Sequence, residues 1–208
     1  MVARQRTLTK ADFVDAATEY VDHHGLNALT MRVLGDLLGV DATACYRHFR
    51  SKGALLAAMV DGLFLSIHEA VPVGGSPRQR LEAQMIASRR AFVAHPQLAA
   101  AIAVSEGDSP AALQLMKNSI ADLRRLGLSG DNLVRGYQAV ESYCIGASIF
   151  DMSRAPENMS IRRARYRFLE DEAFDNVARS DKSVADATEA AFALGMHALL
   201  DFVETLAD

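Results

Sequence analysis

The sequence contains no tryptophan, 2 cysteines and 5 prolines among its 208 residues. Cys45 and Cys144 are far apart, without a Cys-x-x-Cys pair or a histidine at zinc-site spacing, which argues against a disulfide scaffold and a zinc site. Each cysteine is expected to be a small, partly buried apolar residue. The low proline content and a hydrophobic share of 50% exclude a largely disordered chain.

Long hydrophobic runs are also missing. The longest, LAAAIAV from Leu98 to Val104, is much shorter than the roughly 20 residues that cross a bilayer. The opening stretch MVARQRTLTKADF is charged and then polar, and no apolar segment of signal-peptide length follows it. We therefore expect a cytoplasmic protein without a membrane segment, long enough for one or two domains with real cores.

Charge is unevenly distributed along the chain, whose formal net charge is −4. Residues 1–55 hold seven basic and six acidic residues, so this part carries +1. The remainder holds 15 basic and 20 acidic residues, or −5. Within the first part, the stretch LGVDATACYRHFRSK concentrates basic and aromatic residues in a chain that is acidic overall.

Helical periodicity runs through nearly the whole chain, and no stretch alternates as a strand does, so the fold is predicted to be all-α. Thr9 and Asp12 have the spacing of a capping box ahead of a first helix that ends near Gly25. Thr30 is expected to cap a short second helix that ends at Gly39. Asp41 is expected to cap a third helix, and Ser51 a long fourth helix that ends before Pro72.

Two short helices joined by a glycine-containing turn form a helix-turn-helix unit. In the third helix, Cys45 and Phe49 are predicted to point inward, so that the polar side chains of Thr43, Tyr46 and Arg47 face outward. A helix of this kind enters the DNA major groove, where threonine contacts a thymine methyl or a base edge and arginine contacts guanine.

Residues 9–64 resemble the DNA-binding region of the TetR family of bacterial transcriptional regulators. The resemblance rests on LT.R.L…LGV in the second helix and its turn, followed by YRHF.SK..LL. It implies a DNA operator as partner, contacted by Thr30, Arg32, Thr43, Tyr46, Arg47, His48 and Lys52. Arg4 and Arg6 are further candidates for the DNA backbone. Asp41 departs from the usual serine of the family and places a negative charge near phosphate.

The cluster of turn-forming residues PVGGSP, Pro72 to Pro77, is the predicted domain boundary. It separates a DNA-binding domain, residues 1–71 with the linking helix 51–71, from residues 72–208. Further helices are expected over about 77–94, 97–104, 110–126, 130–152, part of 157–180, and 184–206. The resemblance implies that residues 72–208 bind an effector and dimerise.

The last helix presents a stripe of Phe192, Met196, Leu199, Val203 and Leu206, with Gly195 and Ala198 allowing a close approach. Helix 130–152 has a similar pattern with Gly136 and Gly146. By resemblance, these two helices and their symmetry mates are expected to form a four-helix dimer interface. A two-fold dimer also places two recognition helices on successive major-groove faces, about 34 to 36 Å apart.

A small, largely apolar effector with one or two polar groups is expected in the second domain, because such sites are mainly apolar. The candidates are large or polar side chains on helices expected to surround the domain interior: Met85, Phe92, Met116, Tyr137, Glu141 and Tyr143. The competing interpretation is that most of them are ordinary core residues. In the expected mechanism, the effector favours a dimer with splayed recognition helices, and the fourth helix transmits the change.

Two other classes of function are weighed against a ligand-released repressor. One is a DNA-binding protein without an effector, whose second domain only dimerises. The other is an all-α enzyme, against which we find no triad motif, phosphate-binding glycine loop or metal-ligand pattern in the sequence. The expected protein is therefore not an enzyme and needs no cofactor or metal. The run Arg162 to Arg167, RRARYR, is interpreted as a solvated helix face rather than a second nucleic-acid patch.

Overall fold

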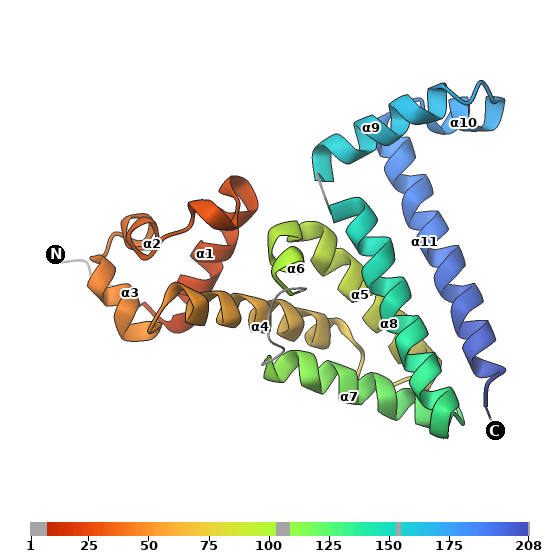
Figure 1. Cartoon of the computed structure of the whole chain (residues 1–208), viewed down its shortest axis with the longest axis horizontal. Helices are drawn as coiled ribbons and strands as arrows, with labels where there is room; N and C mark the ends of the chain where they lie inside the picture. Colours follow the sequence, from red (N-terminus) through yellow and green to blue (C-terminus); the bar gives the residue numbers. More distant parts are fainter. Residues whose placement is uncertain (1–7, 103–108, 153–154, 208) are drawn as a thin grey trace. The chain divides into compact units, whose positions relative to one another are not determined.

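Helices form all of the regular secondary structure in the part of the chain that the computed structural model describes, residues 8–102, 109–152 and 155–207 (Figure 1). This confirms the predicted all-α fold. Arg4 and Arg6 lie outside the described residues. The elements are α1 (Lys10–His24), η1 (Leu26–Ala28), α2 (Met31–Leu38), α3 (Ala42–His48), α4 (Lys52–Ala70), α5 (Pro77–Ala94), α6 (Pro96–Ile102), α7 (Pro110–Arg125), α8 (Gly130–Met152), α9 (Ala155–Arg167), α10 (Glu172–Val177) and α11 (Asp181–Glu204).

The chain divides into two compact units. We call residues 1–66 with 97–113 the N-terminal unit, and residues 67–96 with 114–208 the C-terminal unit. The first unit thus takes in α6 from Gln97 onward and the first turn of α7, as well as the predicted helix-turn-helix. A domain boundary at residues 71 and 72 remains our proposal.

Side-chain caps begin the N-terminal helices as the sequence predicts. Thr9 and Asp12 form a capping box at α1, with Thr9 N donating to Asp12 Oδ2 at 2.7 Å. Thr30 Oγ1 accepts from Val33 N at 3.1 Å, and Ser51 Oγ accepts from Ala54 N at 3.1 Å. Each of these bonds satisfies a backbone N–H that has no partner within its own helix.

Two glycines fix the bend between α2 and α3. Gly39 adopts the left-handed conformation, with φ of 65°, which side chains with a Cβ rarely adopt. Gly35 is buried where a Cβ would lie 2.8 Å from the carbonyl oxygen of Val40, so only glycine lets the turn approach α2 this closely. The Val40 N–H donates to the Gly35 carbonyl at 2.9 Å and closes the bend.

The core of the N-terminal unit is apolar. It includes Phe13, Ala17, Val21, Leu34, Cys45, Phe49, Leu55, Met59 and Leu63, all buried. Among the described helices, α4 alone has the length and hydropathy of a membrane span. A core helix passes the same test, and α4 contributes several of these buried residues, so the observation is weak evidence for a bilayer.

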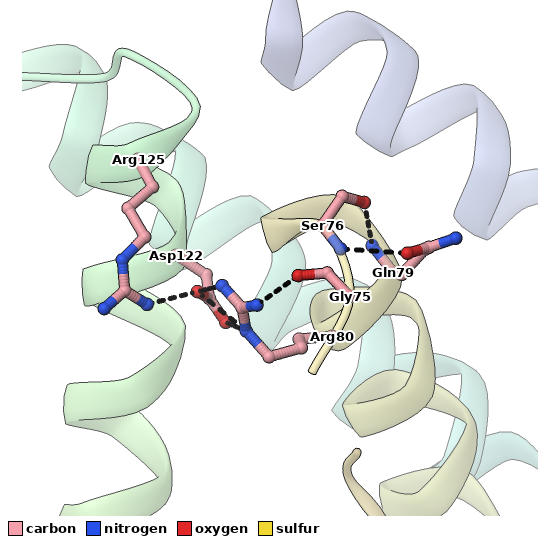
Figure 2. A network of polar contacts seen from close by, with 6 residues as sticks. All are labelled: Gly75, Ser76, Gln79, Arg80, Asp122 and Arg125. Atoms are coloured by element: carbon pink, nitrogen blue, oxygen red, sulfur yellow. Dashed lines mark hydrogen bonds and ion pairs between the residues drawn. The ribbon is translucent and has the colours of Figure 1, made fainter. Parts of the chain in front are cut away.

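The C-terminal unit is built around helices α5, α8 and α11. Its core cluster comprises Leu81, Met85, Leu123, Leu128, Val140, Phe192, Met196, Leu200 and Val203. α5 begins with a second capping box, Ser76 with Gln79 (Figure 2), and has Pro77 at its first position. The Arg89 side chain of α5 is only 3% exposed, forms an ion pair with Glu189 of α11, and lies 4.7 Å from the Phe192 ring centroid.

The prediction that the apolar stripe of the last helix forms a dimer interface is wrong. Phe192, Met196 and Val203 are buried in the core of their own chain. Gly195 makes room for the hydroxyl of Tyr143, and a Cβ on Gly136 would lie 2.6 Å from Leu128 Cδ2, so these glycines serve packing within the chain. The exposed side of α11 instead carries Leu194 and Phe202.

Candidate nucleic-acid interface

Helix α3 has one buried and one exposed side, as its sequence predicts. Cys45 and Phe49 are buried, whereas Thr43 and Arg47 are exposed and Tyr46 is 54% exposed. Because the buried pair anchors α3 against the core, the polar side faces outward, where Thr43 and Arg47 also interact with the Asp41 carboxylate. A helix that reads the major groove needs such an exposed polar side on a helix that the core holds in place.

Helix α2 places two more of the predicted DNA contacts at its start. Thr30 is exposed and its hydroxyl caps α2, and Arg32 is exposed two residues later. The N-terminus of a helix is favourable for an anion, because unpaired N–H groups and the helix dipole both point there. A phosphate at Thr30 therefore has a physical basis.

His48 and Lys52 are half-buried and have contacts inside the N-terminal unit. The rings of His48 and Phe13 lie with centroids 4.6 Å apart, so His48 packs on the core as well as ending α3. Lys52 Nζ donates to the carbonyl oxygen of Leu26 at 2.9 Å, which uses one of its three donors. The remaining donors of Lys52 are sufficient for a phosphate.

Asp41 gives the N-terminus of α3 a permanent negative charge. Its Oδ1 accepts from the Thr43 backbone N–H at 2.8 Å, and hydrogen bonds from Thr43 together with the charge of Arg47 lower the carboxyl pKa. The cap stabilises α3. A negative charge is unfavourable near a DNA phosphate.

The six predicted effector contacts fall in different environments of the C-terminal unit. Met85 is part of the core cluster, with Tyr137 and Tyr143 packed against it, and Phe92 is also buried. Met116 is 40% exposed, and Glu141 is exposed and accepts from Tyr137 Oη at 2.8 Å. The structure thus brings together Met85, Tyr137 and Tyr143, but does not place Met116 with them.

Two tyrosines in this group keep their protons more firmly than usual. Burial, followed by the hydrogen bond and the charge of Glu141, raises the pKa of Tyr137. Burial also raises the pKa of Tyr143, whose hydroxyl donates to the Phe192 carbonyl at 2.8 Å. Both phenols therefore serve as neutral hydrogen-bonding groups beside an apolar core.

Sequence reasoning missed the buried charges of the C-terminal unit. Arg89 pairs with Glu189 at 2.7 Å, and Asp122 is held by Arg80 and Arg125 (Figure 2). Arg80 and Asp122 are 42 positions apart, and Arg89 and Glu189 are 100 apart. No local pattern marks pairs so distant in sequence.

A glycine-bent pair of helices that holds a polar helix outward defines the class of helix-turn-helix proteins. Comparison with known proteins agrees: residues 13–59 match the family described as bacterial regulatory proteins, tetR family, and residues 73–206 match the tetracyclin repressor-like C-terminal domain. The chain belongs to the TetR family.

Relatives described as transcriptional regulators support this assignment. A helix-turn-helix transcriptional regulator of Saccharopolyspora erythraea is 32% identical over 140 residues, which cover 67% of this chain and 59% of the relative. The class A tetracycline repressor of Escherichia coli is 31% identical over 139 residues, covering 64% of this chain and 62% of the repressor. The matches thus span about three fifths of the length of these relatives.

Solved structures share the fold along nearly the whole chain. A TetR regulator from Streptomyces coelicolor superposes with a TM-score of 0.76 at 23% identity, covering 97% of this chain and 100% of that one. A TetR variant from Acinetobacter baumannii, solved in complex with minocycline, gives a TM-score of 0.69 at 22% identity and covers 97% and 99%. At this identity the likeness concerns the fold.

Proposed function

We propose that the protein is a cytoplasmic transcriptional repressor that binds a pseudo-palindromic DNA operator as a homodimer and is released by a small, largely apolar effector. The observation that carries the proposal is the outward polar side of α3, with Thr43, Tyr46 and Arg47 exposed over a buried Cys45 and Phe49. Thr30, Arg32, His48 and Lys52 add contacts to the DNA backbone, which supply affinity and register.

The proposed dimer uses the exposed sides of α8 and α11, two helices that pack together in the C-terminal unit. Leu194 is 74% exposed and Phe202 61% exposed on α11, and Val134 is 54% exposed on α8. Large exposed apolar side chains on two helices that pack together are typical of a surface that a second copy covers.

The proposed effector site lies in the C-terminal unit around Met85, Tyr137 and Tyr143, with Phe92, Met116 and Glu141 as further candidates. An apolar core with two neutral phenols and one exposed carboxylate suits a mostly apolar molecule with one or two polar groups. The TetR variant solved in complex with minocycline has a similar fold, which supports a small-molecule site in this part of the chain. We propose no catalytic residue and no cofactor.

Selection of genomic DNA fragments by the full chain tests DNA binding. The bound fragments should share a two-fold symmetric motif whose half-sites lie about one helical turn apart. Arg47→Ala should cost about 1 to 3 kcal/mol on the selected site and relax the preference at one base pair. An equal loss on selected and random DNA would show that Arg47 does not read a base.

A thermal-shift screen of small molecules tests effector binding. A molecule that raises Tm and also releases the selected DNA supports the repressor. If stabilising molecules leave DNA binding unchanged across the screen, the protein is better described as an effector-independent DNA-binding protein.

A further inference from the structure

The hydroxyl of Tyr143 on α8 reaches the backbone of α11, against which α8 packs (Figure 1). Its Oη donates to the Phe192 carbonyl oxygen at 2.8 Å and accepts from the backbone N–H of Met196. Phe192 and Met196 are four positions apart, so in a regular α-helix these same two groups bond to each other. One phenol of α8 therefore contacts both groups of a single backbone hydrogen bond of α11.

Gly195 leaves the space that this phenol occupies. A Cβ at this position would overlap the Tyr143 hydroxyl and lie 2.9 Å from Cζ and 3.0 Å from Cε2 of the same ring. Glycine inside a helix is less favourable than alanine, because it loses more backbone freedom on folding. Helix formation thus does not explain Gly195, whereas the position of the Tyr143 ring does.

The ring of Tyr143 is held by aromatic and apolar contacts in the core. It stacks on the Phe192 ring with centroids 5.5 Å apart, and it packs against the core cluster of the C-terminal unit. The Arg89 guanidinium lies 4.7 Å from the centroid of the same Phe192 ring. The core therefore places the hydroxyl, and residues 192–196 of α11 must fit around it.

The turn of α11 that holds this hydroxyl also carries an apolar side chain of the proposed dimer surface. Leu194 lies between Phe192 and Met196 in sequence and is 74% exposed, whereas those two residues are buried. A side chain inserted at a backbone hydrogen bond bends a helix locally. The direction in which Leu194 projects thus depends on whether the hydroxyl of Tyr143 is in place.

We propose that Tyr143 is a positioning residue for self-association: its hydroxyl, seated at Gly195, sets the local shape of α11 and so the placement of Leu194 in the dimer surface. The inference rests on the proposed homodimer and adds the residue that shapes its surface from inside the same chain. Because Tyr143 acts through Leu194, its effect on association must disappear when the Leu194 side chain is removed. A residue that only stabilises the fold would not behave in this way.

Two substitutions remove the hydroxyl from α11 in different ways. Tyr143→Phe deletes it, and Gly195→Ala displaces it with a Cβ. Each should weaken self-association, measured by sedimentation equilibrium, at least about fivefold, whereas Tyr143→Phe in a Leu194→Ala background should change it less than about twofold. Tyr166→Phe removes a phenolic hydroxyl of α9 from a ring that packs against Phe174, and as the control it should leave the association constant unchanged.

Thermal melts at a fixed protein concentration test the seat of the hydroxyl itself. Gly195→Ala should lower Tm in the wild-type chain and lower it less in the Tyr143→Phe chain, because the hydroxyl that the new Cβ meets is then absent and alanine favours the helix. A Gly195→Ala chain that folds only when Tyr143→Phe is added supports the same conclusion. Equal losses of Tm in the two backgrounds overturn the proposal, since the hydroxyl then does not occupy the space at Gly195.

The remaining outcomes separate this inference from the proposed homodimer. Association that Tyr143→Phe leaves unchanged overturns the role of Tyr143 and does not affect the homodimer. Equal losses of association in the wild-type and Leu194→Ala backgrounds also overturn it, since Tyr143 then acts on the second copy directly or on the whole fold. If the wild-type chain does not self-associate, the homodimer fails together with the role of Leu194, and the melts still decide whether the Tyr143 hydroxyl is seated in α11.

Discussion

Lys52 of α4 is tied to the backbone of Leu26, with 2.9 Å between its Nζ and the Leu26 carbonyl oxygen. The two residues are 26 positions apart, and the bond joins the start of α4 to the connection between α1 and α2. A lysine predicted from sequence as a phosphate ligand thus also holds the helix-turn-helix together. The proposed phosphate contact and this structural bond would therefore link DNA affinity to the stability of the N-terminal unit through one side chain.

Lys52→Ala is therefore expected to affect both properties. It should weaken binding to selected and random DNA alike and lower the slope of log affinity against log salt by about one. It should also reduce the free energy of unfolding by about 1 kcal/mol, because the Leu26 carbonyl loses its donor. Salt titrations of DNA binding and urea unfolding measure the two effects. Lys10→Ala, at an exposed lysine for which the structure gives no side-chain contact, is the control for stability and should leave it unchanged.

Replacement of Asp41 separates its cap from its charge. Asp41→Ser keeps an oxygen that accepts from the Thr43 N–H and removes the negative charge, so DNA binding should tighten about three- to tenfold at low salt and less at high salt. Asp41→Ala removes the acceptor as well and should lower Tm by roughly 2 to 4 °C. Fluorescence anisotropy at two salt concentrations, with thermal melts, measures both. Unchanged affinity in Asp41→Ser would mean that the carboxylate lies away from phosphate.

Leu194→Asp tests the proposed dimer surface on α11. A charge on this exposed residue should weaken self-association by at least about tenfold, since burying an unpaired carboxylate is unfavourable, while the fold of each chain stays intact. Sedimentation equilibrium gives the association constant. Phe168→Asp is the matched control, because Phe168 is 84% exposed but lies between α9 and α10. Equal effects of the two changes would place the interface elsewhere.

The elements that the sequence predicts well depend on residues close together in the chain. The caps at Thr9, Thr30, Asp41 and Ser51 each act over two or three positions, and the bend at Gly39 depends on a local backbone conformation. The inward side of α3 follows from helical spacing alone. These features can be predicted from sequence because the residues that determine them are neighbours in the chain.

The features that sequence reasoning missed depend on tertiary contacts. Periodicity shows that α11 has an apolar side, but it does not show whether the same chain or a second copy covers that side. Met196, predicted at the dimer interface, lies in the core of its own chain. Helix was expected over part of 157–180, and the structure has two helices there, α9 and α10, with Glu170 at a positive φ of 51° between them. Three of the arginines in RRARYR bond within the fold: Arg162 to Thr188, Arg163 to Asp181, and Arg167 to the Ala178 carbonyl.

Cys144 should be almost unreactive in the folded protein at pH 8. Burial, opposed by a hydrogen bond with Ser88 and the charge of Arg89, raises the pKa of its thiol to about 11, so about one thiol in a thousand is ionised at this pH. In a Cys45→Ala background, Ellman's reagent should react at least about 100 times more slowly with the native chain than with the urea-unfolded chain.

The same shift in the pKa of Cys144 makes stability depend on pH in alkaline solution. The folded state holds the thiol proton more tightly than the unfolded state, where the pKa is near 9.0, so this contribution is fully present below pH 9 and is lost as pH rises to about 11. Urea unfolding at pH 8, 9.5 and 11 should show the decline in the Cys45→Ala chain and a smaller decline when Cys144→Ala is added. An identical pH dependence of stability in both chains would show that folding does not raise the pKa of Cys144. Fast labelling of Cys144 in the native chain would contradict the prediction in the same way.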